Sequence, residues 1–369
     1  MLRIGFDASP LVRPVGGVGW HVFHLVNALL ELDRPHVQFV GYLSSKQQPT
    51  HDYSYWIRSG KLVWVQAKSW GRWMSQIVKD IDVYHGMNFK MPFQGVRGGI
   101  VTIHDLWLDR FPQYSKKLLG QTASFYRTRR TAWKAKRVIA VSRFTSDDLC
   151  DLYGLPQERI AVIPNGVSSE FFVDCHAASH PEVYERYQLP ASKYVLFLGG
   201  ANPRKNHMAL FKALVVCRDI LKTHCVVVVG SQRDRSCDVM ETARRFGVED
   251  RVVCVGTVSV PELRWLYSAA ELFVFPSMYE GFGMPVLEAM ACGVPVVTSD
   301  CSALREVGDD AAVLVNPYDA NDIARGMRLL LENPNYAQMM RDKGLKRAKK
   351  FTWEHAARKT FEVYESICS

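Results

Sequence analysis

The chain has 369 residues, of which 48% are apolar and 22% are charged. This length exceeds what one ordinary hydrophobic core needs and suits two α/β domains, while the composition excludes a disordered chain. An excess of basic over acidic residues, 46 against 37, gives a net charge of +9 and favours partners that carry phosphate, such as a nucleotide or an anionic membrane.

Short, continuously apolar runs alternate with helical patterns such as that of residues 207–222. Continuous apolarity predicts strands that are covered on both faces, as in parallel sheets between helices. In chain order the predicted strands are 2–8, 38–43, 62–66, 83–86, 99–105, 137–142, 159–165, 194–200, 225–230, 251–256, 272–277, 294–299 and 311–316. Two such series predict an α/β protein with two Rossmann-like, doubly wound parallel-sheet domains.

The predicted domain boundary follows Gly166, because Pro and Gly end the last strand of the first series there. We therefore expect one domain over 1–166 and a second over 167–350. An amphipathic helix in 351–369 is expected to pack back toward the first domain. Ligands of open sheets bind beyond the carboxyl ends of the strands, so two facing sheets would place a site between the domains.

The nine cysteines show no Cys-x-x-Cys spacing, and several lie inside apolar runs, as expected for thiols in a reducing compartment. The first residues lack the pattern of a signal peptide, and no stretch of about 18 apolar residues predicts a membrane span. We therefore expect a cytoplasmic protein, with peripheral contact to the cytoplasmic face of the inner membrane as a further possibility.

The segment 275–300 is the most informative part of the sequence. A strand ends at Ser277, and a loop with Glu280 leads to a helix that Pro285 opens. Free N–H groups at the helix start, on Gly283 and Met284, favour an anion or sugar hydroxyls. Glu288 is expected in the first turn, where two carboxylates can bind one polyhydroxylated ligand. The alternative is that Glu288 only complements the helix dipole and that Glu280 is a solvated loop residue.

Two cations, Arg204 and Lys205, follow the predicted strand 194–200, whose last residue is Gly200. An Arg can bind a diphosphate through two hydrogen bonds, and a neighbouring Lys adds a point charge. The alternative is an exposed basic turn that caps the next helix.

The glycine-rich segment 14–19 follows the first strand and is expected to form a loop that opens a helix, with Gly16 and Gly17 close to phosphate. It is not a dinucleotide fingerprint, because Val22 stands where the last glycine is required. His104 and Asp105 end the predicted strand 99–105. A lone histidine is more often a core residue, but the strand end raises the odds of function, and Asp105 can orient the imidazole or cap the next turn.

Two other features are weaker. Asp80 and Asp82 form an Asp-x-Asp pattern, but they precede a strand and so lie at the wrong end of the sheet for a metal site; we predict none. Residues 111–137 contain no acidic residue and eight basic ones, with Phe125, Tyr126 and Trp133 between them. This pattern suits an anionic lipid surface or acceptor through residues 116–137, or simply a solvated basic face. Nucleic acid is disfavoured, because no recognition module accompanies the charge.

The run from Glu280 through Glu288, in EGFGMPVLEAMACGVPVV, resembles the signature of the family-four retaining glycosyltransferases of GT-B fold. The resemblance extends over nearly the whole chain and is greatest to bacterial mannosyl- and rhamnosyltransferases of O-antigen and other surface polysaccharides. It implies that 1–166 binds the acceptor and 167–350 the nucleotide-sugar. Met284 replaces the commoner Leu, which is a conservative change.

The resemblance also implies roles for single residues. Catalytic roles fall to Glu280, which holds the donor sugar, to Arg204 and Lys205, which neutralise the departing diphosphate, and to His104, which contacts the sugar. The remaining donor-binding positions are Gly16, Gly17, Gly200, Val258, Phe282, Gly283, Met284 and Glu288, of which Glu288 binds the ribose and Val258 lies where the base is seated.

The implied reaction is retaining transfer of a hexose or deoxyhexose to a hydroxyl of a glycan or lipid-linked glycan, with neither metal nor cofactor. A GDP-sugar of mannose or rhamnose is the first expectation for the donor, and UDP- or dTDP-sugars are the alternatives. A nucleotide-sugar 2-epimerase of the same fold is the principal rival. A dehydrogenase is disfavoured by the broken glycine fingerprint.

Overall fold

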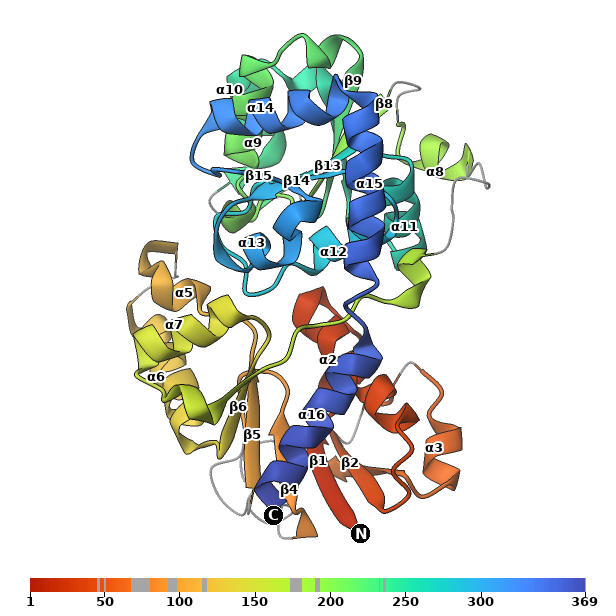
Figure 1. The fold of residues 1–369 in the computed structure, drawn as a ribbon, viewed down its shortest axis with the longest axis vertical. Helices are drawn as coiled ribbons and strands as arrows, with labels where there is room; N and C mark the ends of the chain where they lie inside the picture. Colours follow the sequence, from red (N-terminus) through yellow and green to blue (C-terminus); the bar gives the residue numbers. More distant parts are fainter. Residues whose placement is uncertain are drawn as a thin grey trace. The chain divides into compact units, whose positions relative to one another are not determined.

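A computed structural model describes residues 1–44, 47–49, 51–67, 80–91, 98–114, 118–172, 181–189, 193–231, 233–234 and 237–368. The chain forms two compact units. Unit 1 comprises Met1–Gly166 together with Thr352–Ser369, and unit 2 comprises Val167–Phe351. Each unit is a parallel sheet flanked by helices, so the predicted fold class is confirmed (Figure 1).

Unit 1 contains a seven-stranded parallel sheet in the order β3-β2-β1-β4-β5-β6-β7. Its strands are β1 (Leu2–Asp7), β2 (Val37–Ser44), β3 (Leu62–Ala67), β4 (Val83–Gly86), β5 (Gly98–Ile103), β6 (Arg137–Ala140) and β7 (Ile160–Val162). Its helices are α1 (Ser9–Val12), α2 (Gly16–Glu31), α3 (Ser54–Arg58), α5 (Trp107–Arg110), α6 (Leu118–Lys134), α7 (Arg143–Tyr153) and α16 (Trp353–Cys368). Burial of strands such as β5 on both faces accounts for their continuous apolarity.

Unit 2 contains a six-stranded parallel sheet in the order β12-β9-β8-β13-β14-β15. The strands are β8 (Lys193–Leu198), β9 (His224–Val229), β12 (Val252–Gly256), β13 (Leu272–Phe275), β14 (Val296–Ser299) and β15 (Val313–Val315). The helices are α8 (Pro181–Arg186), α9 (His207–Val216), α10 (Val239–Phe246), α11 (Val260–Ser268), α12 (Met284–Ala291), α13 (Ser302–Gly308), α14 (Ala320–Leu331) and α15 (Pro334–Ala348). A short antiparallel pair, β10 (Arg233–Asp234) and β11 (Cys237–Asp238), was not predicted.

Both sheets reverse their direction of growth at one place. In unit 1 the chain builds β1, β2 and β3 to one side and β4 onward to the other, so that β1 and β4 are neighbours across the reversal. In unit 2 the corresponding neighbours are β8 and β13. The loops that leave such a pair at its carboxyl end diverge, and the space between them is where open α/β sheets bind ligands.

The helix α16 completes unit 1 although it follows unit 2 in the sequence. Figure 1 shows it, in blue, beside α2. Its Tyr364 is fully buried, and the hydroxyl lies 2.8 Å from Nδ1 of His85, whose Nε2 lies 2.7 Å from Thr102 Oγ1. The stacked rings of Trp353 and His24 join the start of α16 to α2. A buried polar network and aromatic contacts thus fasten the helix to the sheet.

Two local expectations need correction. The helical pattern of residues 207–222 does not form one helix, because α9 ends at Val216 and residues 220–222 form a separate 3-10 turn. The segment 14–19 does not form a loop throughout, since α2 begins at Gly16. Gly16 and Gly17 are therefore the first helical residues, and Gly16 has a φ of 64°, which is readily adopted only by glycine.

Candidate functional site

The loop after β13 carries Glu280 into a buried position. The Glu280 backbone N–H donates to Ser302 Oγ over 3.1 Å, and its carbonyl accepts from the N–H of Ala303, in the first turn of α13. Ser302 adopts a φ of 54°, an unfavourable conformation for a non-glycine residue. Glu280 is only 7% exposed, so the alternative of a solvated loop residue is wrong.

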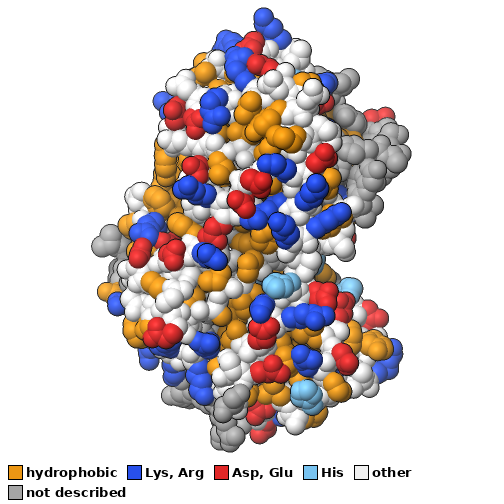
Figure 2. All heavy atoms as spheres, viewed as in Figure 1, with side chains coloured by type: hydrophobic (Ala, Val, Ile, Leu, Met, Phe, Trp, Pro, Cys, Tyr) orange, Lys and Arg blue, Asp and Glu red, His pale blue; other side chains and the backbone are white. Residues whose placement is uncertain are grey.

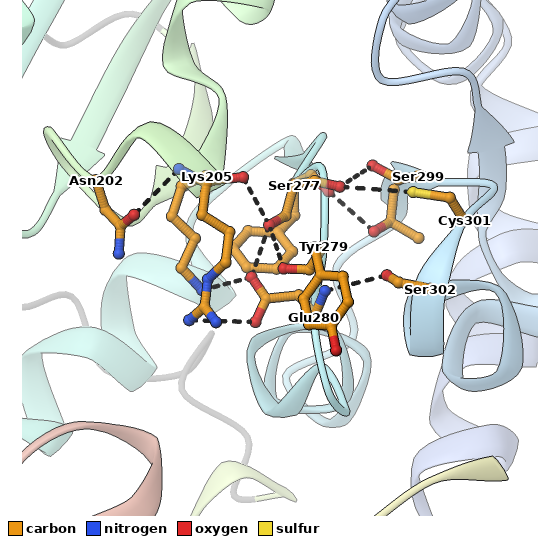
Figure 3. A network of polar contacts seen from close by, with 11 residues as sticks. Asn202, Lys205, Ser277, Tyr279, Glu280, Ser299, Cys301 and Ser302 are labelled. Atoms are coloured by element: carbon orange, nitrogen blue, oxygen red, sulfur yellow. Dashed lines mark hydrogen bonds and ion pairs between the residues drawn. The ribbon is translucent and has the colours of Figure 1, made fainter. Parts of the chain in front are cut away.

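The Glu280 carboxylate is surrounded by donors. Oε1 accepts from Lys205 Nζ at 2.7 Å and from Ser277 Oγ at 2.7 Å (Figure 3). Oε2 lies 3.8 Å from Arg204 Nη2. Burial alone would raise the pKa of Glu280, but the charges of Arg204 and Lys205 and these hydrogen bonds outweigh burial and lower it. The carboxylate is therefore ionised at neutral pH.

The two cations lie in a short 3-10 turn, Pro203–Lys205, which follows β8. Their side chains are 19% and 14% exposed, so the alternative of an exposed basic turn is also wrong. The Lys205 ammonium lies 4.7 Å from the centre of the Phe275 ring, in a cation–π contact. The site thus holds two partly desolvated cations against one buried carboxylate.

Hydrogen bonds between the loops after β8 and β13 hold this arrangement. The carbonyl of Arg204 accepts from the N–H of Met278 at 2.9 Å and lies 3.0 Å from Ser277 Oγ. Asn206 Nδ2 donates to the carbonyls of Pro276 and Pro317. Because these loops leave neighbouring strands across the reversal of the sheet, the site occupies the ligand-binding position of a doubly wound fold.

Gly200 allows the loop after β8 to approach the loop after β9. It has a φ of 53°, and a Cβ atom added there would lie 2.0 Å from the carbonyl oxygen of Ser231. The N–H of the next residue, Ala201, donates to that same oxygen at 2.7 Å. No side chain larger than that of glycine fits at this position without movement of the backbone.

The predicted helix start is present. The helix α12 begins at Met284, Gly283 is its N-cap residue with a φ of 121°, and Pro285 lies in its first turn. The first N–H groups of a helix have no intrahelical acceptor, so this end can bind an anion or hydroxyl oxygens. Phe282 is buried, and its ring contacts that of Phe351 in the same unit.

Glu288 lies one turn further along α12 than expected. It is the fifth residue of the helix, so the prediction of a first-turn position, and with it the dipole alternative, is wrong. The Tyr267 hydroxyl donates to Glu288 Oε2 at 3.2 Å. Burial raises the pKa of Glu288 to about 7, against the opposing effects of this hydrogen bond and of the charge on Lys205. Val258 lies between β12 and α11 and is half-buried, one residue before the capping box that Ser259 forms with Glu262.

The remaining predicted residues, Gly16, Gly17 and His104, belong to unit 1. His104 is buried and its Nε2 donates to the carbonyl of Met87 at 2.8 Å. Its ring makes an edge contact with His21 at 4.5 Å, and burial lowers its pKa, so the ring is neutral. Asp105 accepts from the N–H of Trp107 at 3.2 Å and so caps the following turn.

The Asp-x-Asp pattern lies at the amino end of the first sheet. Asp82 Oδ2 accepts from the backbone N–H of Arg3 at 2.8 Å, which links β1 to the start of β4. Among the residues that the structure describes, no group of three or more His, Cys, Asp or Glu side chains is arranged to hold a metal ion. Figure 2 shows basic and acidic side chains intermixed over the visible face.

The basic segment is only partly described. Lys116 and Lys117 lie outside the described residues, and the segment from 118 is the helix α6, on which Arg127, Arg129, Arg130 and Lys134 are exposed. Trp133 is 43% exposed, but its Nε1 donates to the carbonyl of Tyr153. In the described part of the chain, no helix is both long and apolar enough to cross a membrane.

Sequence reasoning missed four residues that shape the site: Ser277, Ser302, Asn206 and Tyr267. Ser302, Asn206 and Tyr267 act through hydrogen bonds to residues far away in the sequence, and only a signal for spatial proximity could have identified them. Ser277 lies three residues before Glu280 and contacts its carboxylate, but a serine at this spacing carries no signal of its own.

Each unit contains a doubly wound sheet. In unit 2, a buried carboxylate and two cations lie at the strand reversal, beside the start of a helix. Together these features define a glycosyltransferase of the GT-B type. The family model described as "Glycosyltransferase Family 4" matches residues 15–171, and the model "Glycosyl transferases group 1" matches residues 185–347. The chain belongs to this family of glycosyltransferases.

Similar proteins agree with this assignment. The chain is 32% identical to "O-antigen chain mannosyltransferase B" of Escherichia coli over 80% of this chain and 77% of that protein. It is 28% identical over 69% of its length to the E. coli "Serotype-specific mannosyltransferase WbdA", of which it spans only 31%. Sucrose-phosphate synthase from Thermosynechococcus elongatus shares the fold, with a TM-score of 0.76 and 20% identity over 100% of this chain and 99% of that one.

Proposed function

We propose that the protein transfers a hexose, with mannose from GDP-mannose as the first candidate, to a hydroxyl of a glycan or lipid-linked glycan of a surface polysaccharide. The observation that supports this most directly is the Glu280–Arg204–Lys205 cluster beside the start of α12. One relative named as an O-antigen chain mannosyltransferase and another named as a serotype-specific mannosyltransferase support the choice of sugar, and the first also supports the choice of polysaccharide. Rhamnose and UDP- or dTDP-sugars are the alternatives for the donor.

In the proposed reaction, the bond from the anomeric carbon to the diphosphate breaks, and a bond to the acceptor oxygen forms on the same face. The acceptor proton passes to the departing phosphate oxygen, so no protein nucleophile is required. Arg204, Lys205 and the helix-start N–H groups near Gly283 stabilise the negative charge that grows on the diphosphate. Electrostatic stabilisation of this kind is commonly the largest catalytic contribution, and it removes the need for a divalent ion.

The carboxylate and the cations have complementary tasks in this proposal. Without a ligand, Glu280 neutralises Lys205 and Arg204, which keeps two cations tolerable in a partly buried site. With the donor bound, the diphosphate supplies the counter-charge, and Glu280 accepts hydrogen bonds from the sugar hydroxyls. Glu288, on α12, is proposed to accept from the ribose hydroxyls.

Incubation with each donor tests the proposal. Melting temperatures in GDP, UDP and dTDP identify the nucleotide, because ligand binding to the native state raises the melting temperature. The matching nucleotide-sugar and an O-antigen-type acceptor should yield a glycoside of unchanged anomeric configuration by NMR. An inverted product contradicts the retaining step, and isomerisation of the donor without an acceptor identifies a 2-epimerase instead.

We also propose that the basic face of α6 contacts anionic lipid. The exposed cations of this face, Arg127, Arg130 and Lys134, each contribute about 1 kcal/mol near such a surface. Sedimentation with phosphatidylglycerol vesicles should retain the protein at low salt, and neutral phosphatidylcholine vesicles should not. Equal retention by both compositions contradicts the proposal.

A further inference from the structure

Unit 1 contains a cavity of about 420 Å³ at its own strand reversal. Asp7, the last residue of β1, and Tyr84, in the neighbouring strand β4, line it together with the segment that follows β4. This is the position in the first sheet that the Glu280 cluster occupies in the second. Its volume lies within the range of about 300–1,000 Å³ that is usual for small-molecule sites.

The walls combine apolar surface with a few polar groups, which is the usual composition of a small-molecule site. The apolar residues are Pro10, Val22, Met87 and Met91, and the polar ones are Asp7, Tyr84, Asn88, Lys90, Arg127 and Thr131.

Two polar groups in this cavity retain capacity for hydrogen bonds. Tyr84 is only 1% exposed, yet in the described part of the chain no hydrogen bond joins its hydroxyl to another group. The Asp7 carboxyl uses only Oδ1, which accepts from the N–H and the hydroxyl of Ser9. Because the Tyr84 hydroxyl lies at the cavity wall without a partner among the described residues, it can donate to and accept from a polar ligand there.

The segment that follows β4 is held by residues behind the cavity. His104 Nε2 donates to the carbonyl of Met87, and a Cβ atom on Gly86 would lie 1.9 Å from the carbonyl of Lys90. The chain therefore makes a tight turn between Gly86 and Lys90 that only glycine permits. Fixed in this way, Met87 and Met91 present thioether surface on which the apolar face of a ring can lie.

We infer that this cavity binds one neutral sugar ring of the acceptor, with Tyr84 and Asp7 as the hydroxyl-binding residues. The inference rests on the proposed function and assigns a site to the acceptor side of the reaction. A carboxylate accepts from sugar hydroxyls, and a phenol both donates and accepts, so the pair distinguishes a polyol from an apolar ligand of the same size. A hexopyranoside matches this cavity, because its ring has an apolar face for the methionine side chains and a hydroxylated edge for Tyr84 and Asp7.

Ligand-observed NMR titration with methyl α-D-mannopyranoside tests the inference on the full chain. Saturable binding is expected, and both Tyr84→Phe and Asp7→Asn should weaken it about 3- to 10-fold, as for one lost hydrogen bond. Tyr55→Phe and Asp33→Asn are matched controls, since both residues are exposed in the same unit and neither lines the cavity. Their affinities should equal that of the unsubstituted protein.

The melting temperature of Tyr84→Phe provides a second readout. It should not fall, because the hydroxyl that is removed has no partner in the described structure. Absence of saturable mannoside binding, unchanged affinity in both variants, or a lowered melting temperature of Tyr84→Phe would overturn the inference.

Nucleotide thermal shifts on the same samples separate this inference from the proposed function. If the protein binds and uses a nucleotide-sugar but no mannoside, the cavity assignment fails and the proposed function stands. If mannoside binds as described and no nucleotide-sugar is used, the cavity stands and the proposed function fails.

Discussion

Lys205 and Glu280, 75 positions apart in the sequence, form an ion pair of 2.7 Å in a largely buried environment. Each charge is tolerated because the other is present, and the loops that carry them leave neighbouring strands. This pair therefore couples the stability of unit 2 to its proposed activity.

Glu280→Gln should lower kcat at least about 100-fold, because it removes a carboxylate from the donor site. It should also lower the free energy of unfolding by about 3 kcal/mol, because it leaves Lys205 buried without its counter-charge. Steady-state rates and urea unfolding measure the two effects. Glu271→Gln is the matched control, since Glu271 pairs with Lys193 on the surface and should change either quantity little.

Lys205→Met combined with Glu280→Gln should be less destabilised than the sum of the single variants. The double variant leaves no uncompensated charge at position 205, so the coupling between the two residues should be at least about 1 kcal/mol. A double-mutant cycle of unfolding free energies measures the coupling. Strict additivity would contradict the pairing.

Arg204→Ala should also lose most of the turnover, by about 100-fold, since the proposed reaction depends on its charge. Addition of EDTA to the unsubstituted enzyme should leave the rate unchanged, because the proposed reaction uses these cations in place of a divalent ion. A rate that falls in EDTA and returns with Mg²⁺ would contradict this prediction.

The raised pKa of Glu288, about 7, gives a pH dependence of stability with a definite sign. Between the unfolded pKa near 4.5 and the folded value, the native state binds more protons than the unfolded state. The contribution of Glu288 to stability therefore falls as the pH rises through this interval. Glu288→Gln should become more stable relative to the unsubstituted protein from pH 5 to pH 7.5, as measured by urea unfolding at each pH. A constant difference would show that Glu288 does not titrate in this range.

Gly200→Ala should destabilise unit 2 by about 3 kcal/mol or more, because the new Cβ atom would lie 2.0 Å from the carbonyl oxygen of Ser231 and the φ of 53° is unfavourable. Gly293→Ala is the control, since Gly293 has a φ of 71° but no atom within 4 Å of the added Cβ. It should cost only about 1 kcal/mol. Melting temperatures of the two variants measure the difference.

The strands were predictable from the sequence, because a continuous apolar run such as 194–200 is typical of a strand that is buried on both faces. The helix start at Gly283 was predictable for a similar reason, since Pro285 and the glycines mark it locally. The pairing of Glu280 with Lys205 was not. It arises only because β8 and β13 are adjacent, and no local pattern encodes strand order.

The predicted position of Glu288 on α12 was wrong for a different reason. Its expected position depended on where the helix begins, and an error of a few residues moves a side chain into another turn. Tyr84 was placed in a strand without any role, because an unsatisfied hydroxyl cannot be recognised until its neighbours are known.

Unit 1 is discontinuous in the sequence, because it combines residues 1–166 with α16. Tyr364 of this helix is buried against His85 of the sheet. During translation, the seven-stranded sheet therefore remains partly uncovered until the 185 intervening residues, Val167–Phe351, have been synthesised. Unit 2 is continuous in the sequence and can fold while unit 1 still lacks α16. A nascent chain halted before residue 353 would display this uncovered surface and become a client for chaperones.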